Sequence, residues 1–205
     1  AGMAIAGLNA TGRAGQTAAR VDGLEISNVL IADGTYGIDF EVDAASGALF
    51  NNVQINGLEI TDVARKGIYV EALSNSTLRN VTMTDVGQAS TDNVPGSGID
   101  INLKYGTYTG IVIDGFAFTR VGGTSLATEA AIAVKARDDG SYADNPAVYE
   151  GTVEIRNGTI DGTGTGVQVG EPGKNNAGPD VLVEDVTVTN HLDGEFGAFN
   201  NFADG

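Results

Sequence analysis

Residues 37–42 read GIDFEV, and segments of this kind return along the chain at intervals of about thirty residues. A fixed period is typical of proteins in which one structural unit stacks on the next. The first residue of each segment, called its anchor here, follows the previous anchor by 30, 30, 31, 33, 35 and 31 residues. The segments are GLNA from Gly7, GIDFEV from Gly37, GIYVEA from Gly67, GIDINLK from Gly98, AIAVKAR from Ala131, GVQVGE from Gly166 and GAFNNF from Gly197.

A second set of segments lies between these, and each member alternates apolar and polar residues before ending at Asn, Asp or Gly. Such alternation predicts short β-strands that end in turns. No helical periodicity continues for as many as about ten residues. The set comprises LEISNV from Leu24, VQINGLEITDV from Val53, LRNVTMTDV from Leu78, IVIDGFAFTRV from Ile111, VEIRNGTIDG from Val153 and VLVEDVTVTN from Val181.

The two sets together predict an all-β fold, a right-handed parallel β-helix of about seven coils that forms a single domain over residues 1–205. A repeat without a helix cannot be a βαβ unit, and about thirty residues are fewer than the roughly 40 to 45 of a propeller blade. Right-handed winding is the rule for connections between parallel strands. A β-sandwich with evenly spaced strands is the alternative.

Alignment of the repeats produces two apolar columns, as the inward-facing positions of stacked strands require. One position after the anchors stand Leu8, Ile38, Ile68, Ile99, Ile132, Val167 and Ala198. Three positions after the anchors stand Ala10, Phe40, Val70, Ile101, Val134, Val169 and Asn200. The last repeat breaks the second column and is expected to be a frayed end or a cap.

The chain has a formal net charge of −16, 41% hydrophobic residues, no cysteine and one histidine. The charge disfavours nucleic acid and anionic membranes as partners. It suits a solvated extracellular protein, a protein from a high-salt habitat or a cation binder, and composition does not separate these three. Without cysteine, neither a disulfide nor a thiolate metal site can form. No apolar run approaches the roughly 20 residues of a membrane span, and no secretory signal opens the chain. We therefore expect no nucleic acid partner, no membrane insertion, and a mature product or a fragment of a larger secreted protein.

Outward-facing positions of neighbouring repeats bring carboxylates together. Asp39 and Glu41 follow one anchor, Glu71 follows the next, and Asn102 the one after. Like charges on adjacent strands destabilise a sheet unless something compensates them. Calcium binds six to eight oxygens of this kind, so these four residues are predicted ligands of a calcium ion, with Asp43 just beyond them. A solvated acidic surface is the alternative.

Basic residues follow in the later repeats. These residues are Lys104, Lys135 and Arg137. Their side chains can neutralise the carboxylate of an anionic sugar or withdraw a proton from the sugar. A lysine base needs a lowered pKa, which Arg137 beside Lys135 would help to supply. Candidate catalytic residues are therefore Tyr36, Lys104, Lys135 and Arg137, and candidate substrate-binding residues are Tyr69, Asp100 and Tyr105. Ordinary surface ion pairs are the alternative.

The strands of NVTVTN type and the Gly-Ile anchors resemble the pectate-lyase-like parallel β-helix superfamily over nearly the whole chain. Within it, residues 36–41, YGIDFE, resemble the YGFDPHE motif of mannuronan C5-epimerases and related alginate lyases. The resemblance implies a secreted, calcium-dependent enzyme of uronate polysaccharides, with Tyr36 at the catalytic tyrosine, Asp39 at the motif aspartate and Glu71 at an acidic position one turn later. Phe40 stands where the motif has proline, and Glu41 where it has the catalytic histidine.

Three functions are compatible with these patterns, of which the third is a calcium-stabilised domain without a sugar site. The first is an extracellular module that binds an acidic uronate polysaccharide such as alginate or pectate with calcium, and processes it by β-elimination or C5 epimerisation. The second is a non-catalytic structural or adhesin β-helix, which the missing histidine and the short chain favour. Open ends of such a stack are unpaired strand edges, so the second function predicts end-to-end self-association into oligomers or filaments.

Overall fold

The computed structural model describes residues 3–6, 20–42, 49–89, 95–123, 129–171, 173–175 and 178–198. Within these residues the chain is almost entirely β-strand, and the short 3₁₀ helix η1 (Gly140–Tyr142) is the only helix. The strands are β1 (Met3–Ala6), β2 (Arg20–Asp22), β3 (Glu25–Glu41), β4 (Leu49–Asn51), β5 (Gln54–Val70), β6 (Leu73–Ser74), β7 (Ser76–Val86), β8 (Ser97–Leu103), β9 (Gly106–Thr109), β10 (Ile111–Val121), β11 (Ala130–Ala136), β12 (Ala147–Glu150), β13 (Thr152–Val169) and β14 (Asp180–Ala198).

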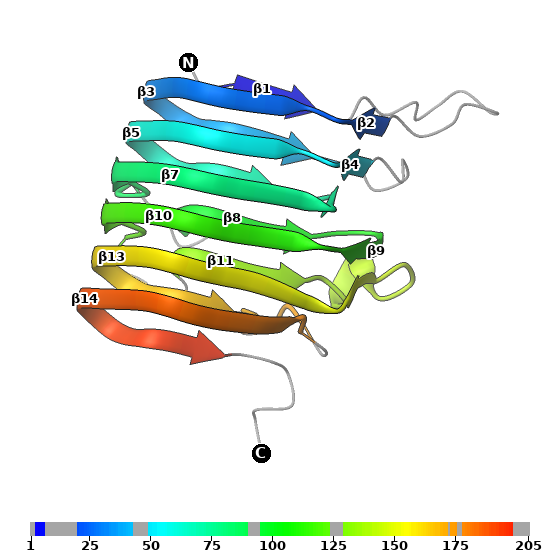
Figure 1. Ribbon diagram of the computed structural model, residues 1–205. Helices are drawn as coiled ribbons and strands as arrows, with labels where there is room; N and C mark the ends of the chain where they lie inside the picture. The colour runs from blue at the N-terminus through cyan, green and yellow to red at the C-terminus, as the bar shows by residue number, and fades with distance from the viewer. Residues whose placement is uncertain are drawn as a thin grey trace.

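The strands pair in parallel with strands about thirty residues away, and Figure 1 shows them stacked one above another. The pairing joins Ile38 to Ile68, Ile68 to Ile99, Ile99 to Ile132 and Ile132 to Val167. Each of these side chains is at most 1% exposed. The predicted inner column is therefore confirmed over these five repeats, because each coil buries its apolar residue against the next.

The two ends of the predicted columns are wrong. Strand β1 places Met3 beside Ile38 and Ile5 beside Phe40, whereas the pattern assigned Leu8 and Ala10, which lie outside the described residues. At the other end Val167 pairs with Phe196, and Ala198 pairs with Val169. The predicted last anchor is thus two positions late. Asn200 and Asp43 also lie outside the described residues.

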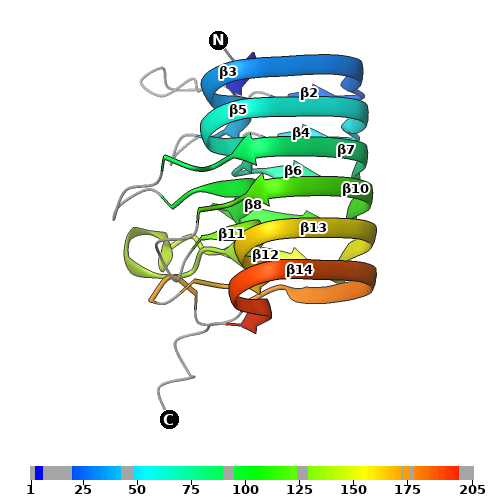
Figure 2. The same cartoon turned by 90° about the vertical axis from the view of Figure 1, so that its left-hand side faces the viewer.

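Each long strand bends at two positions, and the residue at each bend has a positive φ, in the left-handed region. Glycine, asparagine and aspartate tolerate positive φ better than other residues, and they occupy almost every bend. Figure 2 shows β3, β5, β13 and β14 curving around a corner of the stack. The first bend lies at Asn28, Gly57, Asn80, Gly115, Asn157 and Asp185. The second lies at Asp33, Asp62, Asp85, Arg120, Gly162 and Asn190.

The all-β class and the parallel pairing are confirmed. Because β5 and β13 bend, each pairs with one strand up to its second bend and with another beyond it. The pairing consequently closes into a barrel-like ring of six strands, β5–β7–β10–β13–β11–β8, with β1, β3 and β14 attached to it. The pairing does not by itself show a plain stack of seven coils, so the seven-coil solenoid stays a prediction. Two small parallel sheets, β2–β4–β6 and β9–β12, complete the described pairing.

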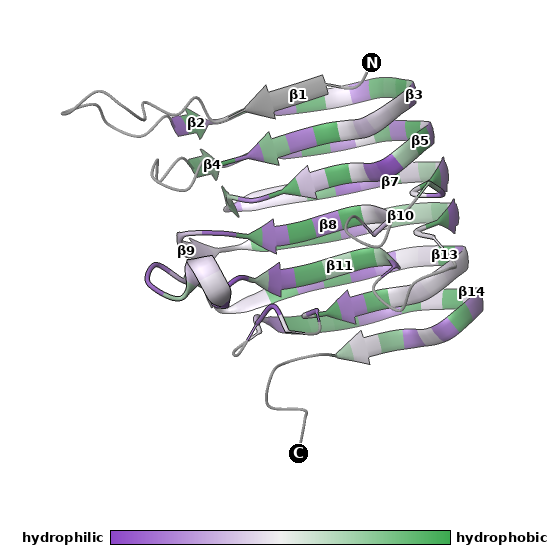
Figure 3. Ribbon diagram, turned by 180° about the vertical axis from the view of Figure 1, so that it is seen from behind, coloured by the Kyte–Doolittle hydropathy of each residue, from purple (hydrophilic) through white to green (hydrophobic). Residues whose placement is uncertain are grey.

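One side of the molecule, called the site face here, consists of residues 36–41 and 66–70, strands β8 and β11, and residues 165–169. Hydrophilic and hydrophobic residues alternate along its strands in Figure 3, as expected where one set faces the core and the other faces outward. No helix among the described residues is long and apolar enough to cross a membrane.

Candidate functional site

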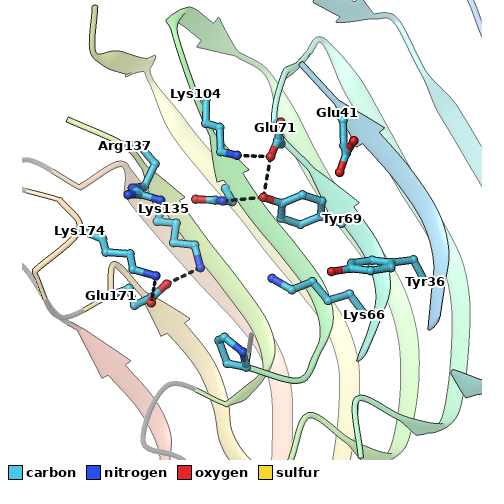
Figure 4. A pocket seen from close by; sticks show the side chains of 12 residues that line it. Tyr36, Glu41, Lys66, Tyr69, Glu71, Lys104, Lys135, Arg137, Glu171 and Lys174 are labelled. Atoms are coloured by element: carbon cyan, nitrogen blue, oxygen red, sulfur yellow. Dashed lines mark hydrogen bonds and ion pairs between the residues drawn. The ribbon is translucent and has the colours of Figure 1, made fainter. Parts of the chain in front are cut away.

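A pocket of about 270 Å³ lies on the site face (Figure 4). Its walls come from five successive repeats, because the outward positions of neighbouring strands lie about 4.8 Å apart. Pro95, from the connection before β8, also reaches it. The lining residues are Tyr36, Glu41, Lys66, Tyr69, Glu71, Pro95, Asn102, Lys104, Lys135, Arg137, Glu171 and Lys174.

Every lysine of the chain lines this one pocket. The sequence contains Lys66, Lys104, Lys135 and Lys174 and no other lysine. With Arg137 they make five of the chain's eleven basic residues, in a protein whose formal net charge is −16. Lysines that serve solubility are scattered over a surface. Here they converge from four different repeats, and each of them pairs with a carboxylate in or beneath the pocket.

Asp100 lies beneath the pocket and is fully buried. It forms ion pairs with Lys66 and with Lys135, whose Nζ lies 3.2 Å from Asp100 Oδ1. Burial acts to raise the pKa of Asp100, but the charges of Lys135 and Lys66 outweigh burial and hold that pKa well below its ordinary value. With an exposed fraction of 0%, Asp100 cannot touch a substrate. The predicted direct substrate-binding role of Asp100 is wrong, and its place is that of a counter-ion.

Lys66 is the pocket lysine whose pKa is lowered. Its burial disfavours the charged ammonium, and the attraction of Asp100 opposes this only in part. Its Nζ lies 4.6 Å from the centre of the Tyr69 ring. Tyr36 is its register partner on β3, and both polar ends point into the pocket in Figure 4. Lys66 thus has the environment expected of a lysine base.

Lys135 does not have that environment. Burial acts to lower its pKa, but Asp100 and Glu171 outweigh burial and raise it. The neighbouring Arg137 is engaged elsewhere: it donates to Asp139 at 2.6 and 2.9 Å and lies 4.4 Å from the centre of the Tyr142 ring. The prediction that Arg137 prepares Lys135 as a base is therefore wrong.

Glu71 is held by several donors at one end of the pocket. The Tyr69 hydroxyl donates to its Oε1 at 2.7 Å, the backbone N–H of Val42 donates to its Oε2 at 2.9 Å, and Lys104 forms an ion pair with it. Asn102 donates to the Tyr69 hydroxyl at 2.8 Å. Burial, followed by the negative charge of Glu71, raises the pKa of Tyr69. The tyrosine therefore stays protonated and acts as a fixed hydrogen-bond donor.

These contacts do not fit the predicted calcium site. The carboxylate of Glu71 is already neutralised by Lys104, and Asn102 directs its amide nitrogen to Tyr69. A calcium ion needs carboxylate and amide oxygens that are free to converge on it. No group of three acidic or histidine residues suited to a metal exists in the part of the chain that the structure describes. Calcium binding stays a prediction without a matching arrangement of donors.

Asp39 lies beside this end of the pocket with its Oδ1 atom buried and without a hydrogen-bond partner. Burial is the largest cause that raises its pKa to about 7, and the nearby charges of Glu41 and Glu71 add to it. Asp39 is consequently protonated in a large share of molecules at neutral pH. The carboxylates of residues 37–42 can lie close together because Asp39 keeps its proton and then does not repel the others.

The titration of Asp39 predicts how stability depends on pH. Its pKa is about 7 in the folded protein against an ordinary value of 3.8, so between these values the folded state binds more protons than the unfolded state. The free energy of unfolding must then fall as pH rises from about 4 to about 7. We expect Asp39→Asn to remove this decline in urea titrations at a series of pH values. Glu59→Gln, at an exposed position, should retain it, and an unchanged slope in Asp39→Asn would contradict the assignment.

The structure brings most of the predicted site residues together. Tyr36, Tyr69, Lys104, Lys135, Arg137, Glu41, Glu71 and Asn102 all line the pocket. Asp39 and Asp100 lie behind its surface, and Tyr105 lies outside the lining, with its ring centre 5.0 Å from that of Tyr142. Sequence reasoning missed Lys66, Glu171 and Lys174. The restriction of all four lysines to the neighbourhood of anchors was the signal that could have found them.

No protein-family model and no curated protein matches the chain. Among solved structures, it is similar to an alginate lyase from Paenibacillus sp. str. FPU-7, with 16% identity and a TM-score of 0.39 over 88% of this chain and 73% of that one. It is also similar to the catalytic domain of a GH87 α-1,3-glucanase in complex with nigerose, with 12% identity and a TM-score of 0.23 over 85% of this chain and 53% of that one. This is a weak likeness of fold, and the site residues carry the functional argument.

Proposed function

We propose that the protein is a secreted, right-handed β-helix module that binds an acidic uronate polysaccharide in the pocket of the site face. The observation that carries this proposal is the convergence of all four lysines on one pocket of a strongly acidic protein. Lysine ammonium groups bind carboxylates as point charges, and the half-buried rings of Tyr36 and Tyr69 supply apolar surface beside them. A uronate residue offers both a carboxylate and an apolar ring face.

We propose further that the pocket removes the C5 proton of the bound uronate. Lys66, whose pKa is lowered by burial, takes that proton on Nζ, and the electron pair moves onto the adjacent carboxylate, where pocket ammonium groups stabilise it. In β-elimination the C4–O4 bond then breaks, a C4–C5 double bond forms, and O4 leaves with a proton from the Tyr36 hydroxyl. In epimerisation the C4–O4 bond stays intact, and the Tyr36 hydroxyl returns a proton to C5 on the opposite face.

The test is incubation of the protein with polymannuronate, alginate and polygalacturonate, with calcium and with EDTA. An ultraviolet absorbance from unsaturated uronate indicates elimination, and loss of the C5 proton signal in deuterated water indicates proton removal. Affinity electrophoresis in gels that contain each polymer, with neutral dextran as the control, measures binding alone. If neither the absorbance nor the exchange is observed, catalysis is rejected. If the protein migrates unretarded in every gel that contains an acidic polymer, the binding site is rejected.

A non-catalytic, self-associating module is the second candidate, and β14 favours it. Leu192 and Phe196 on this strand are 65% and 53% exposed. A cavity of about 430 Å³ beside β14 is lined by Val167, Val169 and further apolar residues. Within the described residues no strand pairs with the free edge of β14. Sedimentation velocity at rising concentration tests it, and a monodisperse monomer at high concentration would reject it.

A further inference from the structure

Glu171 differs from the other carboxylates of the pocket in what holds it. It directly follows Gly170 at the end of β13, and its side chain is only 6% exposed. Its Oε2 lies 2.7 Å from Lys135 Nζ and its Oε1 lies 2.5 Å from Lys174 Nζ. In the described structure this carboxylate thus pairs with two ammonium groups that converge on it within the pocket, which is how a bound carboxylate ligand would be held.

The remaining carboxylates are fixed by stronger constraints. Asp100 is fully buried between lysines of the two strands that flank β8, so its removal would leave the buried Lys66 without an ion-pair partner. Glu71 accepts from a tyrosine hydroxyl and a backbone N–H in addition to Lys104. Glu41 lies exposed at the rim, and the described structure gives it no ion pair. None of these three carboxylates lies between two lysines at a position where a ligand carboxylate could replace it at low cost.

Glu171 can be exchanged without stranding a buried charge. Lys135 retains Asp100 as its second partner when Glu171 moves away. The side chain of Lys174 is 37% exposed and can be solvated. A carboxylate that enters the pocket therefore restores the same two ion pairs, and the exchange replaces one buried charge with another of the same sign.

We propose that the Glu171 carboxylate occupies the carboxylate subsite of the pocket, and that a uronate carboxylate displaces it from Lys135 and Lys174. Glu171 is then an internal competitor that lowers the affinity for the polysaccharide. This inference rests on the proposed uronate binding. It assigns the subsite to the end of the pocket formed by β11 and the segment after β13, away from Glu71 and Lys104 (Figure 4).

The experiment compares the full chain with two variants that each remove one negative charge from an ion-paired glutamate. Glu171→Gln removes the competitor and preserves its size, and Glu154→Gln, which pairs with Arg156 outside the pocket, is the matched control. Isothermal titration with an oligomannuronate should show binding to Glu171→Gln that is about tenfold tighter, the equivalent of one charged hydrogen bond. Glu154→Gln should bind much as the wild type does, apart from a small gain from the general field. Melting temperatures verify that both variants fold.

The possible outcomes separate the two proposals. Binding to Glu171→Gln that is equal to or weaker than that of the wild type would overturn the competitor role, because a carboxylate that merely positions the lysines is needed for affinity. An equal gain in Glu154→Gln would reduce the effect to long-range charge and also overturn it. Wild-type protein and variants that all fail to bind the oligomer would overturn the uronate site itself. A neutral oligosaccharide should bind all three proteins equally weakly.

Discussion

Replacement of Asp100 by asparagine is expected to destabilise the protein by on the order of 3–5 kcal/mol, the usual cost of removing one partner from a buried ion pair. Asp100 is fully buried and is the shared counter-ion of Lys66 and Lys135, which are themselves 6% and 4% exposed. Without it, Lys66 on β5 loses its ion-pair partner, and Lys66 and Lys135 repel each other across β8 in a site of low dielectric constant. Urea unfolding monitored by circular dichroism measures the loss.

Asp85→Asn is the control for this experiment. Asp85 also pairs with a basic residue on the neighbouring strand, at 2.6 Å from Arg120, but both side chains are more than a third exposed. Water and salt screen such a pair, so its loss should change the stability little. Equal effects of the two substitutions would show that the Asp100 cluster has no special role. Lys66→Met in addition to Asp100→Asn should recover part of the loss, because Lys66 is the ammonium that loses its ion-pair partner, whereas Lys135 retains Glu171.

Replacement of Lys66 by arginine is expected to lower the rate of C5 proton removal by about 10²–10⁴, the usual contribution of a general base. Arginine retains the positive charge and the ion pair with Asp100 but does not lose its proton in proteins. Polysaccharide binding should therefore remain close to that of the wild type while turnover is lost. Proton exchange at C5 and affinity electrophoresis measure the two quantities on the same preparations.

The pH profile provides a second measure of the same role. Only the neutral amine accepts a proton, so wild-type activity should rise with pH through the pKa of Lys66, with a midpoint below the ordinary value of 10.5. Arg79→Lys, at a half-exposed position of β7 outside the pocket, should preserve both rate and profile. A Lys66→Arg variant of undiminished activity would exclude Lys66 as the base and leave the pocket with a binding role only.

Much of the fold could be read from the repeat. The period of about thirty residues and the apolar column from Ile38 to Val167 predicted which residues pair, since each inward residue must pack on its counterpart in the next coil. The ends failed because a terminal repeat packs on one neighbour only and so needs no strict pattern. In β14, Phe196 occupies the column and remains 53% exposed.

The pocket could be predicted in part. Outward columns placed Tyr69, Asn102 and Lys135 correctly because they follow the period of two within strands. Lys66 was missed because it lies directly before its anchor, and Tyr36 was the only residue considered at that position of the repeat. Glu171 and Lys174 were missed because they lie beyond the end of β13, in a connection whose path no strand period describes.

By itself, the sequence determined that the chain is built of parallel strands about thirty residues apart and that carboxylates and lysines gather on one outward face. These properties depend on patterns that recur in every repeat. Only the tertiary structure decided the role of each charge, because a pKa depends on depth and on the nearest partners. Lys66 and Lys135 are both buried pocket lysines, yet one has a lowered pKa and the other a raised one. Two carboxylates reach Lys135 at ion-pair distance, while Asp100 is the one carboxylate that pairs with Lys66 among the residues that the structure describes.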